Sequence, residues 1–340
     1  MRWPLMRWAV AAGLVVAMLA FGIGVYEVAG MLRHNGHGVS KPTEIRAPSL
    51  PGTMYVVQGG AIYRLSHGSF RQITAENGWM QPAAAPNGQL VVVRREQNYS
   101  DLYLLSSTGA RVSQLSHNAS SQVVEGNHWT FYPRFSPDGH ALFYDFDPKD
   151  PYNSYRVDLA IFTSPMTGGG SAFEWTTPND YTGGDVEPVP LRDGSLLYTK
   201  YSIDDSFQVH SQLWLQRRAG SQGVALTTAS AGCGQPAVSP DETRIAMVCT
   251  RGSNQAAELD LATFDPANQT LGSPATLVSG RLVASPAFSP DGKSVAFLAP
   301  DAPGGQFQLW TVGSQGPASV RQVTSNLGLD ASSAPVWVNG

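Results

Sequence analysis

Short apolar runs separated by polar turns recur along the chain, most clearly around two near-identical segments, Pro133–Gly139 and Pro286–Gly292. Each segment reads Pro-x-Phe-Ser-Pro-Asp-Gly and is followed by an apolar run, Ala141–Tyr144 in one copy and Val295–Leu298 in the other. Pro, Asp and Gly fit successive positions of a type I turn that ends in a left-handed residue, which is a common hairpin connection. The pattern therefore predicts a strand, a tight turn and a second strand in each copy.

Weaker copies bring the number of proline-led strands to six. Their prolines are at positions 82, 133, 188, 236, 286 and 335, so the successive gaps are 51, 55, 48, 50 and 49 residues. Two further apolar segments follow each complete hairpin, which gives about four strands per repeat. A period near 50 with four strands is typical of β-propeller blades. Because proline cannot donate to a ladder, we expect these strands at sheet edges, where the first strand of a blade lines the central channel.

The two ends of the repetitive region supply one further repeat between them. Residues 53–74 hold three apolar segments without a proline-led first strand, whereas residues 335–338 form a first strand with nothing after it. Pairing these ends closes a ring, and closure removes the exposed sheet edges at the seam. The predicted fold is an all-β, six-bladed propeller over residues 53–340, closed by its N- and C-terminal strands.

The repeat resembles the TolB-like (WD40-like, PD40) propeller repeat. The resemblance rests on Pro-x-Phe-Ser-Pro-Asp-Gly, a third strand and then Arg-Gln-Val-Thr; it is strongest at 131–146 and 286–324 and extends over 53–338. It implies the propeller fold but no particular activity, because one architecture supports many functions. The sequence departs from TolB itself by lacking the additional N-terminal α/β domain, so TolB's partners are not implied.

The N-terminal residues predict a membrane anchor. Trp8 to Tyr26 is a run of 19 uncharged residues preceded by Arg2 and Arg7, long enough to span about 30 Å of hydrocarbon as a helix. The basic residues favour an N-terminus on the cytoplasmic side. We expect residues 1–32 to form a transmembrane signal-anchor; a signal peptide cleaved near Val28-Ala29-Gly30 is the alternative. No Cys follows the run, which excludes a lipoprotein anchor.

Residues 33–52 are rich in Gly, Pro, Ser and charge without periodicity, which predicts a flexible stalk. His34 and His37 lie in this stretch, and we interpret them as solvated, since two ligands alone do not close a metal site. The predicted topology places the propeller outside the cytoplasm, held to the plasma membrane by one helix. The resemblance to the TolB-like repeat implies a bacterial source.

Composition narrows the class of partner. Only 14% of residues are charged, against about a quarter in typical domains, and polar uncharged side chains take their place at the surface. The net charge is −4 and no basic stripe is present. Nucleic-acid binding is therefore not expected.

The two cysteines, Cys233 and Cys249, lie at equal distances from Asp241, in the predicted hairpin turn. They should face each other on adjacent antiparallel strands, where Cβ atoms are about 4.5–5.5 Å apart, close to the spacing of about 3.8 Å that a disulfide requires. We expect a disulfide, which an extracytoplasmic domain permits. The alternative is two buried thiols.

The long connections should all emerge on one face of the propeller, where second strands join third strands and each blade joins the next. Over the third and fourth blades this face is acidic and rich in aromatic residues, more than turns require, which indicates binding. The candidate binding residues are Trp129, Tyr152, Tyr155, Tyr181, Phe207, Asp147, Asp150, Asp204 and Asp205.

Three interpretations of this face compete. It can be a docking surface for an envelope protein or cell-wall ligand, with aromatic side chains as anchors. The four aspartates can instead form a Ca²⁺ site, although no twelve-residue calcium loop is present. The third interpretation is solvated loops with structural Asp turns. Asp138, Asp241 and Asp291 are left out of every site, because the hairpin explains them.

Enzyme motifs are missing: the sequence has no Gly-x-Ser-x-Gly elbow and no His-Glu-x-x-His. We therefore expect no catalytic residues and no cofactor, and a function in binding or scaffolding. Some TolB-like propellers are metal-dependent polysaccharide lyases, so a lyase or glycosidase that uses His117, His128 and His210 on the loop-rich face is the alternative.

Overall fold

The computed structural model describes residues 50–148, 158–166, 171–251, 257–315 and 319–340. The predicted anchor (1–32), almost all of the predicted stalk (33–52) and the candidate residues Asp150, Tyr152 and Tyr155 lie outside these ranges. Within them, no helix is long and apolar enough to cross a membrane. Their regular elements are strands and two short 3-10 turns, η1 (Val124–Gly126) and η2 (Ala229–Ala231).

The strands form six antiparallel sheets, numbered here as blades 1 to 6. Blade 1 contains β25 (Val336–Val338), β1 (Thr53–Gln58), β2 (Ala61–Ser66) and β3 (Ser69–Gln72), and blade 2 contains β4 (Trp79–Ala84), β5 (Leu90–Arg95), β6 (Ser100–Leu105) and β7 (Arg111–Gln114). Blade 3 contains β8 (Thr130–Phe135), β9 (Ala141–Phe146), β10 (Ala160–Pro165) and β11 (Phe173–Glu174). Blade 4 contains β12 (Asp185–Pro190), β13 (Leu196–Ile203), β14 (Val209–Gln216) and β15 (Val224–Ala225). Blade 5 contains β16 (Cys233–Val238), β17 (Arg244–Cys249), β18 (Glu258–Asp265), β19 (Thr270–Leu271) and β20 (Ala275–Val278), and blade 6 contains β21 (Ala284–Phe288), β22 (Ser294–Pro300), β23 (Phe307–Gly313) and β24 (Arg321–Gln322).

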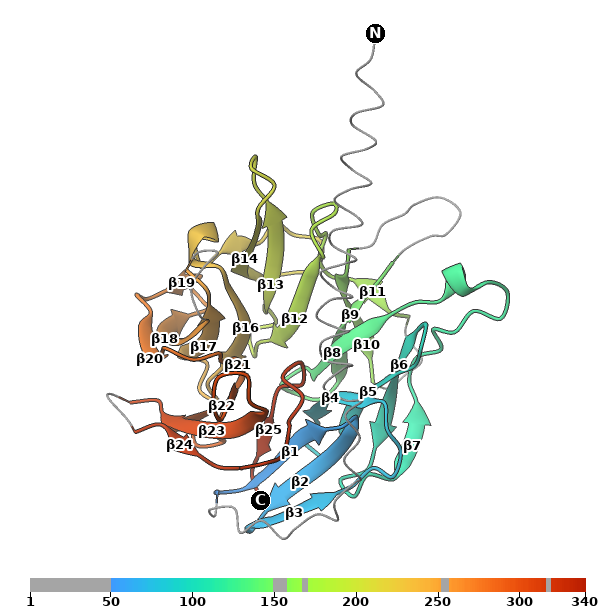
Figure 1. The fold of residues 1–340 in the computed structure, drawn as a ribbon. Helices are drawn as coiled ribbons and strands as arrows, with labels where there is room; N and C mark the ends of the chain where they lie inside the picture. Colours follow the sequence, from blue (N-terminus) through green and yellow to red (C-terminus); the bar gives the residue numbers. More distant parts are fainter. Residues whose placement is uncertain (1–49, 149–157, 167–170, 252–256, 316–318) are drawn as a thin grey trace. The chain divides into compact units, whose positions relative to one another are not determined.

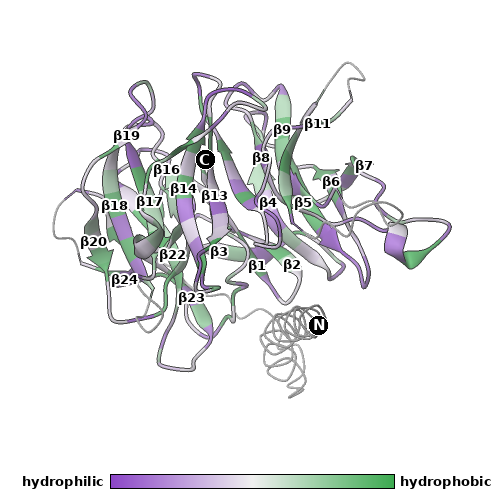
Figure 2. Ribbon diagram, turned by 90° about the horizontal axis from the view of Figure 1, so that it is seen from above, coloured by the Kyte–Doolittle hydropathy of each residue, from purple (hydrophilic) through white to green (hydrophobic). Residues whose placement is uncertain are grey.

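The innermost strands arrange the sheets in a ring. Each contacts the innermost strand of the next blade, in the order β25, β4, β8, β12, β16, β21 and back to β25, and Figure 1 shows the sheets following one another in sequence colours. Apolar side chains fill the space between blades: Met54 and Leu65 of blade 1 pack with Leu298 and Leu309 of blade 6. Hydrophobic residues lie mostly on the strands (Figure 2). The predicted six-bladed propeller is confirmed.

The two ends of the propeller meet in blade 1. The C-terminal strand β25 pairs antiparallel with β1, with Trp337 opposite Met54. The Trp337 indole Nε1–H donates to the Pro51 carbonyl at 2.7 Å. The seam that the sequence predicted is therefore closed by strand pairing and by a buried tryptophan.

Five of the six repeated prolines lie inside an innermost edge strand rather than at its start, whereas Pro335 directly precedes β25. The strand register skips at each of the five, which marks a β-bulge. The residue before each of these five prolines has a left-handed backbone, although none is glycine, and such a conformation costs about 1–3 kcal/mol. These residues are Gln81 (φ 49°), Tyr132 (48°), Glu187 (60°), Gln235 (53°) and Ser285 (53°).

A hydrogen bond from each left-handed residue ties its blade to the preceding one. The Gln235 N–H donates to Glu187 Oε2 and the Ser285 N–H to Gln235 Oε1, each at 2.7 Å. The Ser285 hydroxyl donates to the Ala331 carbonyl at 2.8 Å, just ahead of β25, which completes the circuit. We use the name axial relay for the left-handed residues that donate these N–H groups together with the residues whose side chains accept them. Its members are Ser333, Gln81, Tyr132, Asp145, Glu187, Gln235 and Ser285.

Blade 5 holds the two cysteines and one strand that the sequence did not predict. Cys233 of β16 lies opposite Cys249 of β17, and the two are joined by a disulfide. Strand β18 extends to Asp265, where it pairs with the additional strand β19. The side chain of Asp265 accepts hydrogen bonds from Asn268 and so holds the turn of this small hairpin.

The Ser-Pro-Asp turns hold their aspartates locally. The Ser239 hydroxyl donates to Asp241 Oδ1 at 2.5 Å, and this bond is the main reason that the pKa of Asp241 is lowered to about 2. The Ser136–Asp138 and Ser289–Asp291 pairs repeat the contact. The left-handed position after the aspartate holds Gly139 (φ 75°) in one copy and Glu242 (φ 57°) in another.

Opposite effects on stability are expected at these equivalent positions. Glu242→Gly should raise the free energy of unfolding by about 0.5–1 kcal/mol, because glycine adopts the left-handed conformation without a Cβ clash. Gly139→Ala should lower it by about 1 kcal/mol for the same reason. Urea denaturation of both variants measures the change in the free energy of unfolding. A loss of stability in both would contradict a left-handed backbone at position 242.

Removal of residues 333–340 should open the ring. This deletion eliminates β25 and the Ser333 acceptor of the axial relay, so we expect the melting temperature to fall by on the order of 10 °C and the exposed β1 edge to promote aggregation. Deletion of 339–340 alone leaves β25 intact and is the control. Equal melting temperatures for the two truncations would refute closure as the stabilising contact.

Candidate functional site

Four connections of blades 3 and 4 carry the described candidate residues. They are the link from β7 to β8, the connection from β9 to β10 that begins with Asp147, the link from β11 to β12, and the β13–β14 hairpin, which projects beyond its sheet in Figure 1. A hydrogen bond from Asn179 Nδ2 to the Tyr201 carbonyl, at 3.0 Å, joins the last two. The loops of blade 4 thus lie side by side.

The first connection is held by Asp147, which is buried. Its Oδ1 accepts hydrogen bonds from the Trp129 backbone N–H at 2.9 Å and from His128 Nδ1–H at 3.0 Å. The Trp129 ring is half-buried, stacks on Phe131 and lies 5.7 Å from the guanidinium carbon of Arg95. Asp147 and Trp129 therefore fix the link between blades 2 and 3.

The β13–β14 hairpin is held by Asp204. Its Oδ1 accepts from the N–H groups of Ser206 and Gln208 at 2.8 and 2.9 Å, and its Oδ2 lies 2.8 Å from His210 Nε2. The hydrogen bond with His210 is the largest of the effects that lower the pKa of Asp204. The neighbouring Asp205 is exposed, and the Phe207 side chain is 68% exposed at a left-handed position (φ 60°).

The link from β11 to β12 is held by a residue that the sequence did not single out. The buried carboxylate of Asp158 accepts hydrogen bonds from three successive backbone N–H groups, those of Tyr181, Thr182 and Gly183, at 2.7–2.8 Å. Tyr181 is left-handed (φ 60°) and 64% exposed. An isolated aspartate before a strand carries no sequence signal for this role, which depends on the returning loop.

Tyr181 and Phe207 are the two most exposed of the large hydrophobic and aromatic side chains in the described residues. Both project from turns of blade 4 that carboxylates hold in place. We call this pair the blade-4 aromatic tips. The structure thus divides the predicted aromatic set: Trp129 packs against its neighbours, whereas Tyr181 and Phe207 face solvent.

A buried ion pair lies at the base of the same loops. Lys200 Nζ is 2.9 Å from Asp185 Oδ1 and also donates to the Thr177 carbonyl at 3.1 Å. Both side chains are almost fully buried. The pair links β12 and β13 to the loop that carries Tyr181, so it supports the aromatic tips from below.

The axial relay adds a second group of titratable residues between blades 3 and 4. Burial raises the pKa of Asp145 well above its usual value and also raises that of Glu187, while it lowers the pKa of Arg134. Burial also raises the pKa of Tyr201 to about 12. Asp145 has no exposed surface, and its Oδ2 accepts the Glu187 N–H at 3.2 Å. No pattern in the sequence indicated this cluster.

Metal ligation was the alternative for the acidic and histidine residues. No group of three or more His, Cys, Asp or Glu side chains in the described ranges is placed to hold a metal ion. His128 and His210 instead pair with Asp147 and Asp204, respectively. Asp150, the fourth aspartate of the Ca²⁺ interpretation, lies outside the described residues.

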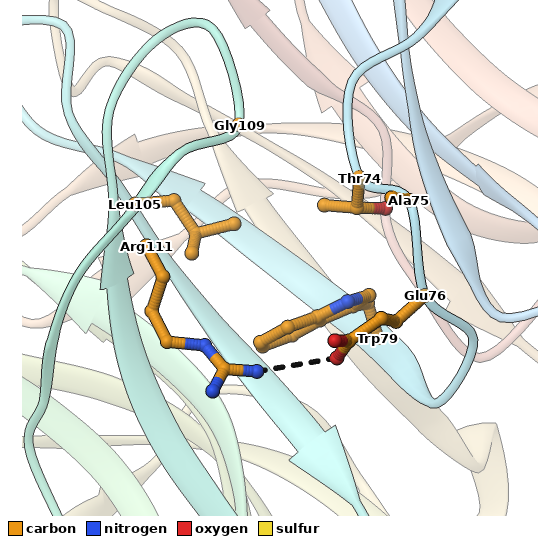
Figure 3. Close-up of a pocket in the computed structure, with 7 residues that line it drawn as sticks. All are labelled: Thr74, Ala75, Glu76, Trp79, Leu105, Gly109 and Arg111. Atoms are coloured by element: carbon orange, nitrogen blue, oxygen red, sulfur yellow. Dashed lines mark hydrogen bonds and ion pairs between the residues drawn. The ribbon is translucent and has the colours of Figure 1, made fainter.

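Two cavities lie between neighbouring blades. One of about 170 Å³, between blades 1 and 2, is shown in Figure 3, where Arg111 reaches across Trp79 to Glu76 at 3.2 Å. The other, of about 340 Å³, lies between blades 4 and 5, and the Cys233–Cys249 disulfide forms part of its wall. None of the six candidate binding residues that the structure describes lines either cavity.

Comparison with solved structures identifies the fold. TolB from Acinetobacter baumannii superimposes with a TM-score of 0.63 at 18% identity, over 85% of this chain and 67% of its own. A structure described as TolB from Agrobacterium tumefaciens gives 0.59 at 16% identity, over 84% of this chain and 94% of its own. The chain has a TolB-like propeller fold.

Proteins with other activities have the same propeller architecture. An oligogalacturonate lyase in complex with manganese matches with a TM-score of 0.51 at 15% identity, over 78% of this chain and 70% of its own. Neither a scan against protein-family models nor a search of curated proteins finds a match to the sequence. At these identities the likeness establishes the fold alone, so function must be argued from the residues of this chain.

A pH-dependent effect is expected at Asp145. Because its folded pKa is raised, its contribution to stability is fully present below the unfolded pKa and is lost as pH rises through the folded pKa. Asp145→Asn keeps an acceptor for the Glu187 N–H and removes the ionisation, so its melting temperature relative to wild type should increase between about pH 4 and about pH 8.

Asp241→Asn is the matched control for this experiment. The pKa of Asp241 is lowered to about 2, so its titration lies below that range and the difference from wild type should stay constant within it. A constant difference for Asp145→Asn as well would show that the buried carboxyl does not titrate differently in the folded state.

Proposed function

We propose that the protein is a membrane-anchored, extracytoplasmic binding module that recognises a macromolecular partner of the cell envelope through the loops of blade 4. The observation that carries the proposal is the exposure of the blade-4 aromatic tips on turns that are rigidly held. Exposed aromatic side chains with a polar rim are the usual anchors of protein interfaces. The long uncharged run at residues 8–26 supports the location.

The supporting contacts favour recognition by a preformed surface. Asp158 and Asp204 between them bind five backbone N–H groups, those of residues 181–183, 206 and 208. These bonds hold Tyr181 and Phe207 in backbone conformations that bulky residues seldom adopt. Side chains that are positioned before binding lose less conformational entropy when a partner covers them.

Site-specific photo-crosslinking in intact cells tests the proposal. A photoreactive phenylalanine analogue in place of Tyr181 or Phe207 should give the same discrete adduct from both positions, because one partner covers both rings. Phe173 on the outer strand of blade 3 is also exposed, at 51%, and is the matched control. Adducts of equal yield from all three positions, or none from blade 4, would contradict the proposal.

A further inference from the structure

The blade-4 loops carry exposed acidic side chains, of which Asp204 pairs with His210 of the same hairpin. Residues 177–184 and 203–209 contain three aspartates, Asp180, Asp204 and Asp205, and no lysine or arginine. All three aspartates are exposed. The nearby Lys200 is buried and directed to Asp185 and the Thr177 carbonyl, so it does not offset them at the surface.

The aromatic tips and the aspartates occupy the same two loops. Tyr181 directly follows Asp180, and Phe207 lies two residues after Asp205 in the hairpin. The faces of aromatic rings attract Lys and Arg side chains, and attract them most strongly where water is excluded. Carboxylates beside such rings add a second interaction with the same cation.

This combination selects among the possible partners. Anionic envelope polymers would be repelled by the three carboxylates. A neutral glycan could stack on the rings but would gain nothing from the carboxylate charges. A protein segment with exposed Lys or Arg gains from both features at once, since its alkyl stems cover the rings while its charges meet the aspartates.

We propose that the blade-4 loops bind a cationic protein segment, whose Lys or Arg side chains meet Tyr181 and Asp180 on one loop and Phe207 and Asp205 on the other. The inference rests on the proposed function and specifies the chemistry of its partner. Electrostatic attraction speeds the encounter and fixes the orientation, and the aromatic tips hold the bound segment. Complementary charge also accounts for the lack of basic residues in the two loops.

The test uses the full-length protein in detergent and a soluble peptide of Arg residues spaced by Gly-Ser, with a matched peptide that carries Glu in place of Arg. The Arg peptide should bind, and its affinity should fall as salt rises from about 20 to about 500 mM. Tyr181→Ala and Phe207→Ala should each weaken binding by about fivefold or more. Asp205→Lys should weaken it by about tenfold or more.

Two variants separate specific binding from attraction to any acidic protein. Phe173→Ala removes an exposed phenylalanine from blade 3, and Asp301→Lys reverses an exposed charge in the β22–β23 hairpin of blade 6. Both should leave the affinity unchanged. Equal effects of Asp205→Lys and Asp301→Lys, or binding of the Glu peptide, would overturn the inference.

The identity of the crosslinked partner tests the inference independently of the peptide measurements. Adducts from position 207 that map to a Lys- or Arg-rich protein segment support the inference. Adducts that map to an acidic segment or to a glycan overturn it while leaving the proposed function intact. A lack of blade-4 adducts counts against the proposed function itself, so the two failures are distinguishable.

Discussion

The hydrogen bonds of the axial relay are the constraint on which the propeller depends. At each bulge the backbone N–H of a left-handed residue leaves the strand ladder, and a buried N–H requires another acceptor. The preceding blade supplies that acceptor from Ser333, Gln81, Asp145, Glu187 or Gln235. Neighbouring blades are therefore aligned by directional bonds at the centre as well as by apolar packing between sheets, and the backbone strain at the bulges is maintained by the ring as a whole.

The loops of the candidate binding surface are attached to strands that also carry residues of the axial relay. The Glu187 N–H of blade 4 donates to the Asp145 side chain of blade 3, and Glu187 Oε2 accepts the Gln235 N–H of blade 5. Strand β12, which carries Glu187, begins with Asp185, whose partner Lys200 also holds the loop of Tyr181 through the Thr177 carbonyl. Strand β12 and the contacts of Lys200 thus connect the centre of the ring to the loop that carries Tyr181. The loops of blade 4 can project because their bases are fixed.

The sequence predicted the number of blades and their closure because both follow from local patterns: the Ser-Pro-Asp-Gly hairpin and its period are visible in single segments. It did not predict left-handed residues before the prolines, since proline disfavours helical conformations in the preceding residue and the bulge is imposed by contacts between blades. The binding residues were predicted by type and loop but not by role. Asp204 and Asp205 are neighbours, yet one holds the turn and the other faces solvent. Trp129 and Phe207 looked equivalent, and only tertiary contacts separate them.

Pairing of β1 with β25 has a consequence for the order of events during biosynthesis. Strand β1 is synthesised near the start of this domain, whereas its partner β25 is synthesised about 280 residues later. At synthesis rates of about 5–20 residues per second, the nascent chain carries an unpaired edge for roughly 15–60 seconds. Five blades can form before β25 is available, but the sixth needs that strand. A chain truncated before β25 would keep a nearly complete domain with an unpaired strand edge, the kind of species that quality-control proteases and holdases recognise.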